Sequence, residues 1–89
     1  MSKILDEAGK FVIGVWLTKV YLPRTARDEP KYFVRLMKQV GATPTQATIM
    51  VRRYIERRPF KTIPGEGVNL DIRSVFREHK RVIDKLIAY

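Results

Sequence analysis

The stretch that decides the fold is residues 32–58, YFVRLMKQVGATPTQATIMVRRYIERR. It contains two amphipathic patterns with a short turn between them. In the first pattern the apolar side chains recur at i, i+1, i+4, i+5 and i+8, which predicts one buried helical face made of Tyr32, Phe33, Leu36, Met37 and Val40. Gly41 should end this helix, because glycine readily takes the positive φ of a helix C′ position.

The second helix begins with the sharpest local signal in the chain, a capping box over residues 43–46. The Thr43 hydroxyl can accept a hydrogen bond from the Gln46 amide, and the Gln46 side chain can reach back to the Thr43 backbone. Pro44 falls at the first helical position, where its missing N–H is harmless. We expect this helix to run until Pro59. At 100° per residue, one side carries Ala47, Met50, Val51, Tyr54 and Ile55, and the other carries Thr45, Thr48, Ile49, Arg52 and Arg53, with Gln46 at its edge.

The positive charge is concentrated in the same region. The chain has a formal net charge of +9, and residues 31–61 hold eight Lys or Arg against Glu56 alone. The flanks, residues 1–30 and 62–89, each hold five basic against four acidic residues. A local excess of this kind is typical of a surface that binds a polyanion.

The flanking segments are also read as helical. Residues 2–22 follow a helical pattern that Ser2 can cap, with Asp6 and Glu7 in the first turn and Pro23 as the stop. A strand over residues 11–21 is the alternative, because FVIGVW is rich in β-formers and Gly14 is a poor helix residue. Asp28 is expected to cap the helix that contains residues 32–40, with Pro30 in its first turn.

The segment from residue 60 to 68 is rich in turn formers. Pro64-Gly65-Glu66-Gly67 predicts a tight turn, across which residues 61–63 and 68–69 either pair as a short β-hairpin or form a plain loop. Asn69 or Asp71 then caps a last helix. This helix carries a stripe, mostly apolar, at helical spacing: Ile72, Val75, His79, Val82, Leu86 and Tyr89. Three further apolar residues widen the stripe: Phe76, Ile83 and Ile87.

Composition limits the class of protein. The predicted fold is a single all-α domain spanning residues 1–89, with four helices and a helix-turn-helix at about residues 30–58. With no Cys and one His, no metal site or cofactor is predicted. The longest apolar run, residues 11–17, is too short for a membrane span, and no signal peptide is expected, so we expect a soluble cytoplasmic protein. No catalytic constellation is visible, and we expect no enzyme activity.

The two helices around Gly41 resemble the helix-turn-helix DNA-binding superfamily over some 22 residues. The structural positions of that pattern are occupied by Leu36, Met37, Val40, Gly41, Ala42, Thr43, Ala47 and Met50. Met37 departs from the pattern, which normally has a small residue there. The resemblance implies that the second helix faces the DNA major groove with Thr45, Gln46, Thr48, Ile49 and Arg52.

The chemistry of these five side chains points the same way. Arg reads guanine, Gln reads adenine, and apolar or Thr methyl groups contact thymine in the major groove. The predicted phosphate contacts are Lys31, Arg35, Lys38, Thr43, Arg53, Arg57 and Lys61.

The sequence therefore predicts a small basic DNA-binding protein, with double-stranded DNA as the partner. A regulator of transcription or of another DNA transaction, from a virus or mobile element, fits the size. A homodimer is expected through Ile72, Val75, His79, Val82 and Leu86 or through the first helix, and His79 is read as a core or interface histidine. The alternatives are a helical inhibitor or adaptor that docks on a larger nucleic-acid-processing assembly, and an RNA-binding protein.

Overall fold

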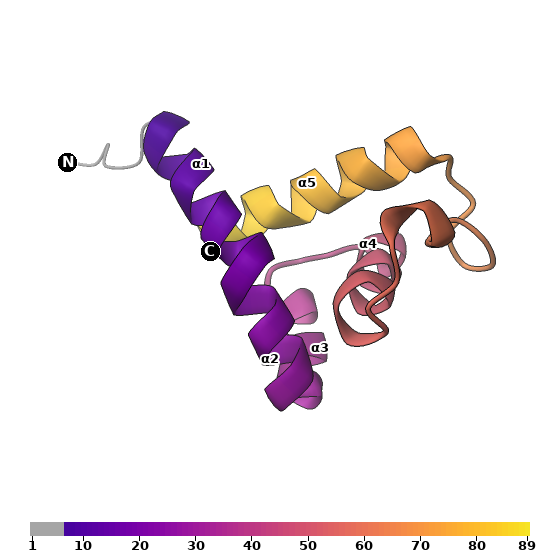
Figure 1. The fold of residues 1–89 in the computed structure, drawn as a ribbon, viewed down its shortest axis with the longest axis horizontal. Helices are drawn as coiled ribbons and strands as arrows, with labels where there is room; N and C mark the ends of the chain where they lie inside the picture. The colour runs from indigo at the N-terminus through magenta and orange to yellow at the C-terminus, as the bar shows by residue number, and fades with distance from the viewer. Residues whose placement is uncertain (1–6) are drawn as a thin grey trace.

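The computed structural model describes residues 7–89, which form four helical runs and no β-strand (Figure 1). The predicted all-α fold is confirmed. In chain order the elements are α1 (Glu7–Trp16), the π-helical segment η1 (Leu17–Tyr21), α2 (Leu22–Asp28), α3 (Pro30–Gln39), α4 (Pro44–Met50), the π-helical segment η2 (Val51–Ile55), the 3-10 helix η3 (Phe60–Thr62) and α5 (Ile72–Ala88).

The first helical run continues past Pro23. The backbone is α-helical at both ends of η1, at Trp16 and at Leu22, so the helical reading of residues 11–21 is confirmed and the predicted stop at Pro23 is wrong. Proline has no N–H to donate, and its ring clashes with the carbonyl four residues earlier in an α-helix. The wider π turn, closed by the Leu22 N–H donating to the Leu17 carbonyl, comes directly before Pro23 and accommodates it. The expected cap at Ser2 and the acid at Asp6 lie outside the described residues.

The α2–α3 junction differs from the prediction by one residue. Glu29, not Asp28, is the N-cap of α3, and its side chain makes no capping bond. A residue that precedes proline is pushed out of the α region, and Glu29 before Pro30 has φ −140°. Asp28 is instead the last residue of α2, where Arg27 Nε donates to its carboxylate at 2.8 Å.

The turn between α3 and α4 forms as predicted. Gly41 has φ +80°, and the Ala42 N–H donates to the Met37 carbonyl at 3.0 Å, which closes the helix in a Schellman motif. The capping box is complete, since the Gln46 N–H donates to the Thr43 hydroxyl at 3.1 Å and the Thr43 N–H donates to Gln46 Oε1 at 3.0 Å. The helical run ends at Ile55 rather than near Pro59.

The segment before α5 is a loop with one short bridge. Gly65 and Val68 exchange backbone hydrogen bonds of 2.9 and 2.8 Å, and residues 60–62 form η3, so the hairpin through residues 61–63 is not formed. The loop alternative is correct. Of the two predicted caps, Asp71 is the one used, accepting from the Ser74 N–H at 2.8 Å.

The helical run of α4 and η2 lies between two apolar clusters. The larger cluster joins the first helical run, α3, η2 and α5, and its buried members are Leu17, Leu22, Ala26, Phe33, Leu36, Met37, Met50, Tyr54, Val82 and Ile83. The smaller cluster consists of Ile49, Ile63, Val68 and Val75 and joins α4, the loop and α5. Consequently α4 is covered on two sides.

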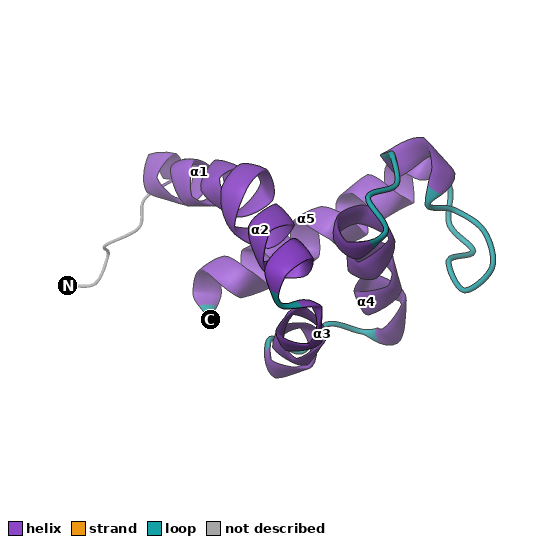
Figure 2. Ribbon diagram, turned by 60° about the horizontal axis from the view of Figure 1, so that its bottom comes forward, coloured by secondary structure: helices purple, strands orange, loops and turns teal. Residues whose placement is uncertain are grey.

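The views show how the elements surround α4. In Figure 1, α5 passes behind α1, and α4 lies below the first half of α5. In Figure 2, α3 runs below α2 and α5. Gly14 lies where α1 packs against α5, and a Cβ there would make ordinary van der Waals contact with Ile83 at 3.7 Å and Ile87 at 3.9 Å. Among residues 7–89, no helix combines the length and the apolar character that crossing a membrane requires.

The small cluster makes a stability prediction. Ile49→Ala should lower the free energy of unfolding by about 2–4 kcal/mol, because it removes a fully buried side chain and leaves a cavity. Val34→Ala, at an exposed position of α3, is the control and should change it by less than about 0.5 kcal/mol. Urea unfolding followed by circular dichroism measures both. An Ile49→Ala variant as stable as the control would contradict the burial of Ile49.

Candidate nucleic-acid interface

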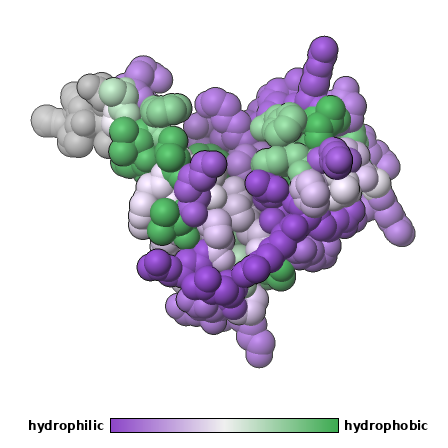
Figure 3. Space-filling model, viewed as in Figure 1, coloured by the Kyte–Doolittle hydropathy of each residue, from purple (hydrophilic) through white to green (hydrophobic). Residues whose placement is uncertain are grey.

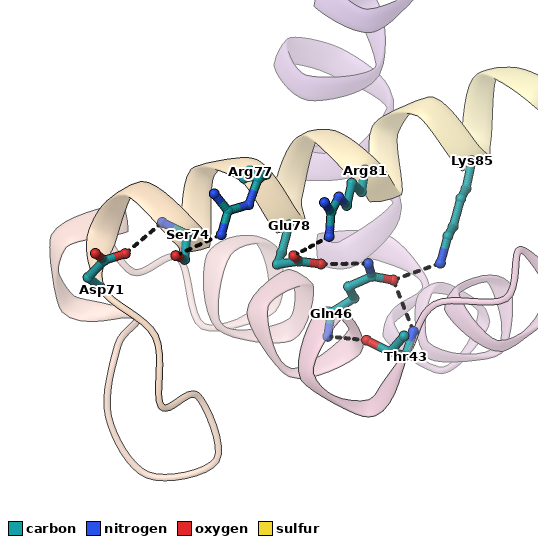
Figure 4. A network of polar contacts seen from close by, with 8 residues as sticks. All are labelled: Thr43, Gln46, Asp71, Ser74, Arg77, Glu78, Arg81 and Lys85. Carbon is teal, nitrogen blue, oxygen red and sulfur yellow. Dashed lines mark hydrogen bonds and ion pairs between the residues drawn. The ribbon is translucent and has the colours of Figure 1, made fainter.

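Gln46, predicted to contact bases, lies inside the protein. Its side chain is 4% exposed, and its polar atoms have partners on two helices (Figure 4). Gln46 Nε2 donates to Glu78 at 2.8 Å, while Oε1 accepts from the Lys85 ammonium at 2.8 Å and from the Thr43 N–H. In this structure Gln46 is therefore not exposed for the predicted contact with a base, because its amide ties α4 to α5.

Ile49 and Arg52 are covered by the loop after η2. Ile49 is fully buried in the small cluster, so it is not exposed for the predicted contact with a thymine methyl. Arg52 Nη1 donates to the Ile63 carbonyl at 2.8 Å, and Nη2 donates to the Glu66 carbonyl. Arg52 thus holds the loop against α4 instead of offering its guanidinium to a base.

The two threonines complete this face of α4. Thr45 and Thr48 are half-buried, and the Thr48 hydroxyl donates to the Pro44 carbonyl at 2.9 Å. The Thr48 methyl lies beside Gly67 of the loop. Major-groove reading needs a helix whose outer face protrudes. Here α5 and the loop cover that face, so the five predicted base-reading residues do not form an exposed group.

Most of the residues predicted to contact phosphates are exposed, unlike the predicted base-reading residues. Five of the seven are exposed cations: Lys31, Arg35, Lys38, Arg57 and Lys61. Arg53 is half-buried, with its guanidinium 4.2 Å from the centre of the Phe60 ring. Thr43 is exposed, but its hydroxyl already serves the capping box.

Three of these cations form a stripe along α3, which we call the α3 stripe: Lys31, Arg35 and Lys38. They are spaced i, i+4 and i+7, so they share one face of the helix. The four ion pairs among the described residues join Arg27 to Asp28, Arg58 to Glu56, Lys80 to Asp84 and Arg81 to Glu78. None involves the α3 stripe, and α3 contains no acidic residue. Its positive charge therefore faces solvent uncompensated.

A buried polar cluster lies where η2 meets α5. The Tyr54 hydroxyl is 2.7 Å from His79 Nε2, and the two rings stack with centroids 5.7 Å apart. His79 was predicted as a core or interface histidine with a hydrogen-bonding neighbour; it is partly buried, and Tyr54 is that neighbour. Burial, assisted by the positive charge of Arg53, lowers the pKa of His79 to about 4. Burial raises the pKa of Tyr54 to about 12, although Arg53 opposes that shift.

Two residues of the predicted dimer seam on α5 are used within the monomer. Val75 and Val82 are fully buried within the monomer, so they cannot contact a second copy. Exposed apolar side chains lie instead on the first helical run: Phe11, Val12, Val15, Trp16 and Val20. Figure 3 shows apolar surface over α1, at the end of the molecule next to the grey atoms.

Comparisons with protein-family models, curated protein sequences and solved structures find no match to this chain. Within residues 7–89, no group of three or more His, Cys, Asp or Glu side chains is placed to hold a metal ion. The geometry and charge of the surface are thus the basis for inferring function.

The buried histidine predicts a pH dependence of stability. Its folded pKa of about 4 lies below the ordinary value of 6.5, so the unfolded chain binds the proton more tightly. The contribution of neutral His79 to the free energy of unfolding should be fully present above pH 6.5 and should fall as the pH drops toward 4. The total loss should be on the order of 3 kcal/mol. Unfolding free energies measured between pH 7 and about 5, above the range of ordinary carboxylates, test this.

His79→Gln is the matched variant, because it keeps a polar side chain but cannot titrate. Its stability should be nearly constant over the same pH interval. A wild-type protein equally stable at the two ends of the interval would contradict the neutral, buried state of His79.

Proposed function

We propose that the protein binds nucleic acid through the phosphate backbone, chiefly with the α3 stripe. The observation that carries this proposal is the exposure of three cations on one helical face with no carboxylate partner. Free cations on one face can displace the counterions condensed on a nucleic acid, which is the main source of sequence-independent affinity. Arg57 and Lys61 add two exposed cations in the same basic segment.

The dimensions of the stripe support this use. Seven residues of α-helix rise about 10 Å, which along a DNA axis corresponds to about three phosphates of one strand. Backbone contacts position a protein but carry no direct sequence information. Since α5 and the loop cover the side of α4 expected to read bases, we propose duplex DNA as the partner with little sequence preference. An RNA duplex is the alternative that the same assay separates.

A second candidate function is self-association through α1. Its exposed apolar side chains suit a protein surface better than a polyanion, and a two-fold dimer buries the same patch on both copies. If the α1–η1 segments of two copies packed antiparallel, Glu7 of one copy would lie toward Lys19 of the other, and these opposite charges attract. We therefore propose a homodimer with α1 at its centre, and the adaptor alternative predicts a monomer that binds another protein there.

The α3 stripe predicts the salt dependence of duplex binding. If all five exposed cations of residues 31–61 contact phosphates, the log–log slope of the association constant against salt should be about −4.5. The triple substitution Lys31→Ala, Arg35→Ala and Lys38→Ala should reduce the slope to about −2. Fluorescence anisotropy with labelled DNA and RNA duplexes between 50 and 200 mM salt, the range over which such binding weakens steeply, measures both.

α5 offers a matched control with the same spacing. Arg73, Arg77 and Lys80 are also exposed at i, i+4 and i+7, but Glu78 and Asp84 lie on the same helix and Lys80 pairs with Asp84 at 3.3 Å. Replacing these three with Ala removes the same charge and should leave the slope near the wild-type value. Equal effects of the two triple variants would show that only net charge matters and would remove the α3 stripe from the proposal.

The dimer proposal predicts a change in mass. Phe11→Glu combined with Val12→Glu should give a monomer, because it places charge in the centre of the apolar patch. Size-exclusion chromatography with light scattering at tens of micromolar protein measures the mass. Val34→Glu, at an exposed apolar position on α3, is the control and should remain dimeric. A monomeric wild-type protein would reject the dimer.

A further inference from the structure

A surface depression of about 270 Å³ lies where the η1–α2 part of the first helical run meets the end of η2. We call it the arginine pocket, and it is lined by Thr18, Pro23, Arg27, Arg53, Tyr54 and Arg57. Three of these six side chains are guanidinium groups and none is a carboxylate. Several guanidinium groups around one concave surface suit the binding of a phosphate group.

Arg53 is held in place before any ligand binds. Its guanidinium stacks 4.2 Å from the centre of the Phe60 ring, and Nη1 donates to the Arg58 carbonyl at 3.1 Å. A guanidinium has five N–H donors, so this bond leaves others free. Because the side chain is already ordered, little further entropy is lost when an anion binds.

Arg57 occupies a backbone position that favours glycine. It is the one non-glycine residue with positive φ in the described chain, at φ +59°, and it follows Glu56, the C-cap of η2. The Arg58 N–H then donates to the Arg52 carbonyl at 2.9 Å and closes the turn. A side chain with a Cβ is less favourable than glycine there, so the arginine at this position lowers stability. Such strain is a reason to look for a function of the side chain. Arg57 lines the pocket, and none of the four ion pairs among the described residues involves it.

Arg27 has one competitor, the neighbouring Asp28. The two side chains pair at 2.8 Å, but both are more than half exposed, so the pair is weak and readily exchanged. The buried groups behind the pocket add no negative charge. Burial raises the pKa of the Tyr54 phenol to about 12, and the His79 imidazole that it contacts is neutral near pH 7.

We propose that the arginine pocket binds a phosphate group, held by Arg27, Arg53 and Arg57. The source of that phosphate rests on the proposed function and is a nucleic acid, either a backbone diester or a terminal monoester. Phosphate binding by the arginine pocket does not depend on the α3 stripe. Phosphate binding by the pocket and nucleic-acid binding by the α3 stripe can therefore be rejected separately.

Inorganic phosphate is the first probe. Titrating it into the ¹⁵N-labelled full chain at constant ionic strength, with chloride as the reference anion, should shift the Arg57 and Arg58 amide signals along a saturating curve. The α3 triple variant should give the same phosphate curve while it loses duplex affinity. A curve that does not saturate, or one that chloride reproduces, would overturn the pocket.

Two single substitutions then test the geometry in opposite directions. Arg57→Gly should weaken phosphate binding about tenfold, as expected for losing a charge-assisted contact, and should raise the Tm by about 4 °C because the strain is relieved. Asp28→Asn should strengthen binding about threefold, because it removes the competing carboxylate. Arg24→Ala removes an exposed charge of α2 outside the pocket and is the control. Unchanged phosphate affinity in Arg57→Gly would reject the proposal even though that variant folds.

Oligonucleotide competition identifies the source. A short single strand with a 5′-phosphate and the same strand without it are each added to the phosphate-saturated protein. Stronger displacement by the phosphorylated strand assigns the pocket to a terminal monoester, and equal displacement assigns it to a backbone diester. Displacement by neither strand would reject a nucleic-acid source.

Discussion

The structure depends on one buried amide. Gln46 sits at the start of α4 and donates to Glu78 while it accepts from Lys85, so its side chain bridges two positions of α5 separated by nearly two turns. A buried polar side chain that lost either partner would leave an unsatisfied group, which costs about 1–3 kcal/mol and more for a charged partner. The amide therefore fixes both the rotation and the position of α4 against α5. With α4 held in this way, Ile49 must face the small cluster and Tyr54 the large one.

Local chemistry accounts for the part of the fold that could be predicted. The capping box at Thr43, the positive φ of Gly41 and the cap at Asp71 each depend on a few neighbouring residues, and all three formed as expected. Pro23 was misread because a proline usually ends a helix, whereas a π turn can absorb it when the flanking apolar residues must stay on a buried face. Asp28 was misread because the steric effect of Pro30 reaches only the residue directly before it.

The candidate site was harder to predict because its residues are positioned by distant partners. Exposed cations such as Lys31 and Lys38 were placed correctly, since charged side chains are rarely buried. The exposure of the predicted base-reading side of α4 was not predicted correctly. Helical periodicity shows which residues share a side of a helix but not how many sides other segments cover. The available signal was the apolar pair Ile63 and Val68, which lie in a turn-rich loop and need a surface to cover them. Ile49, an apolar residue on an otherwise polar helix face, is part of the surface that covers Ile63 and Val68.

The burial of α4 also bears on the proposed nucleic-acid binding. A helix covered on two sides presents no free reading face. Of the arginines near its end, Arg52 holds the loop, while Arg53 of η2 and Arg57 of the turn after η2 line the arginine pocket. The charge that remains lies on α3, whose outer face carries no acid, while the apolar excess lies on α1. The proposed anion binding uses arginine and lysine side chains and does not involve His79, whose pKa is lowered to about 4 by burial. Arg57, in the turn after this run, has a left-handed backbone and lines the arginine pocket together with Arg53 of η2.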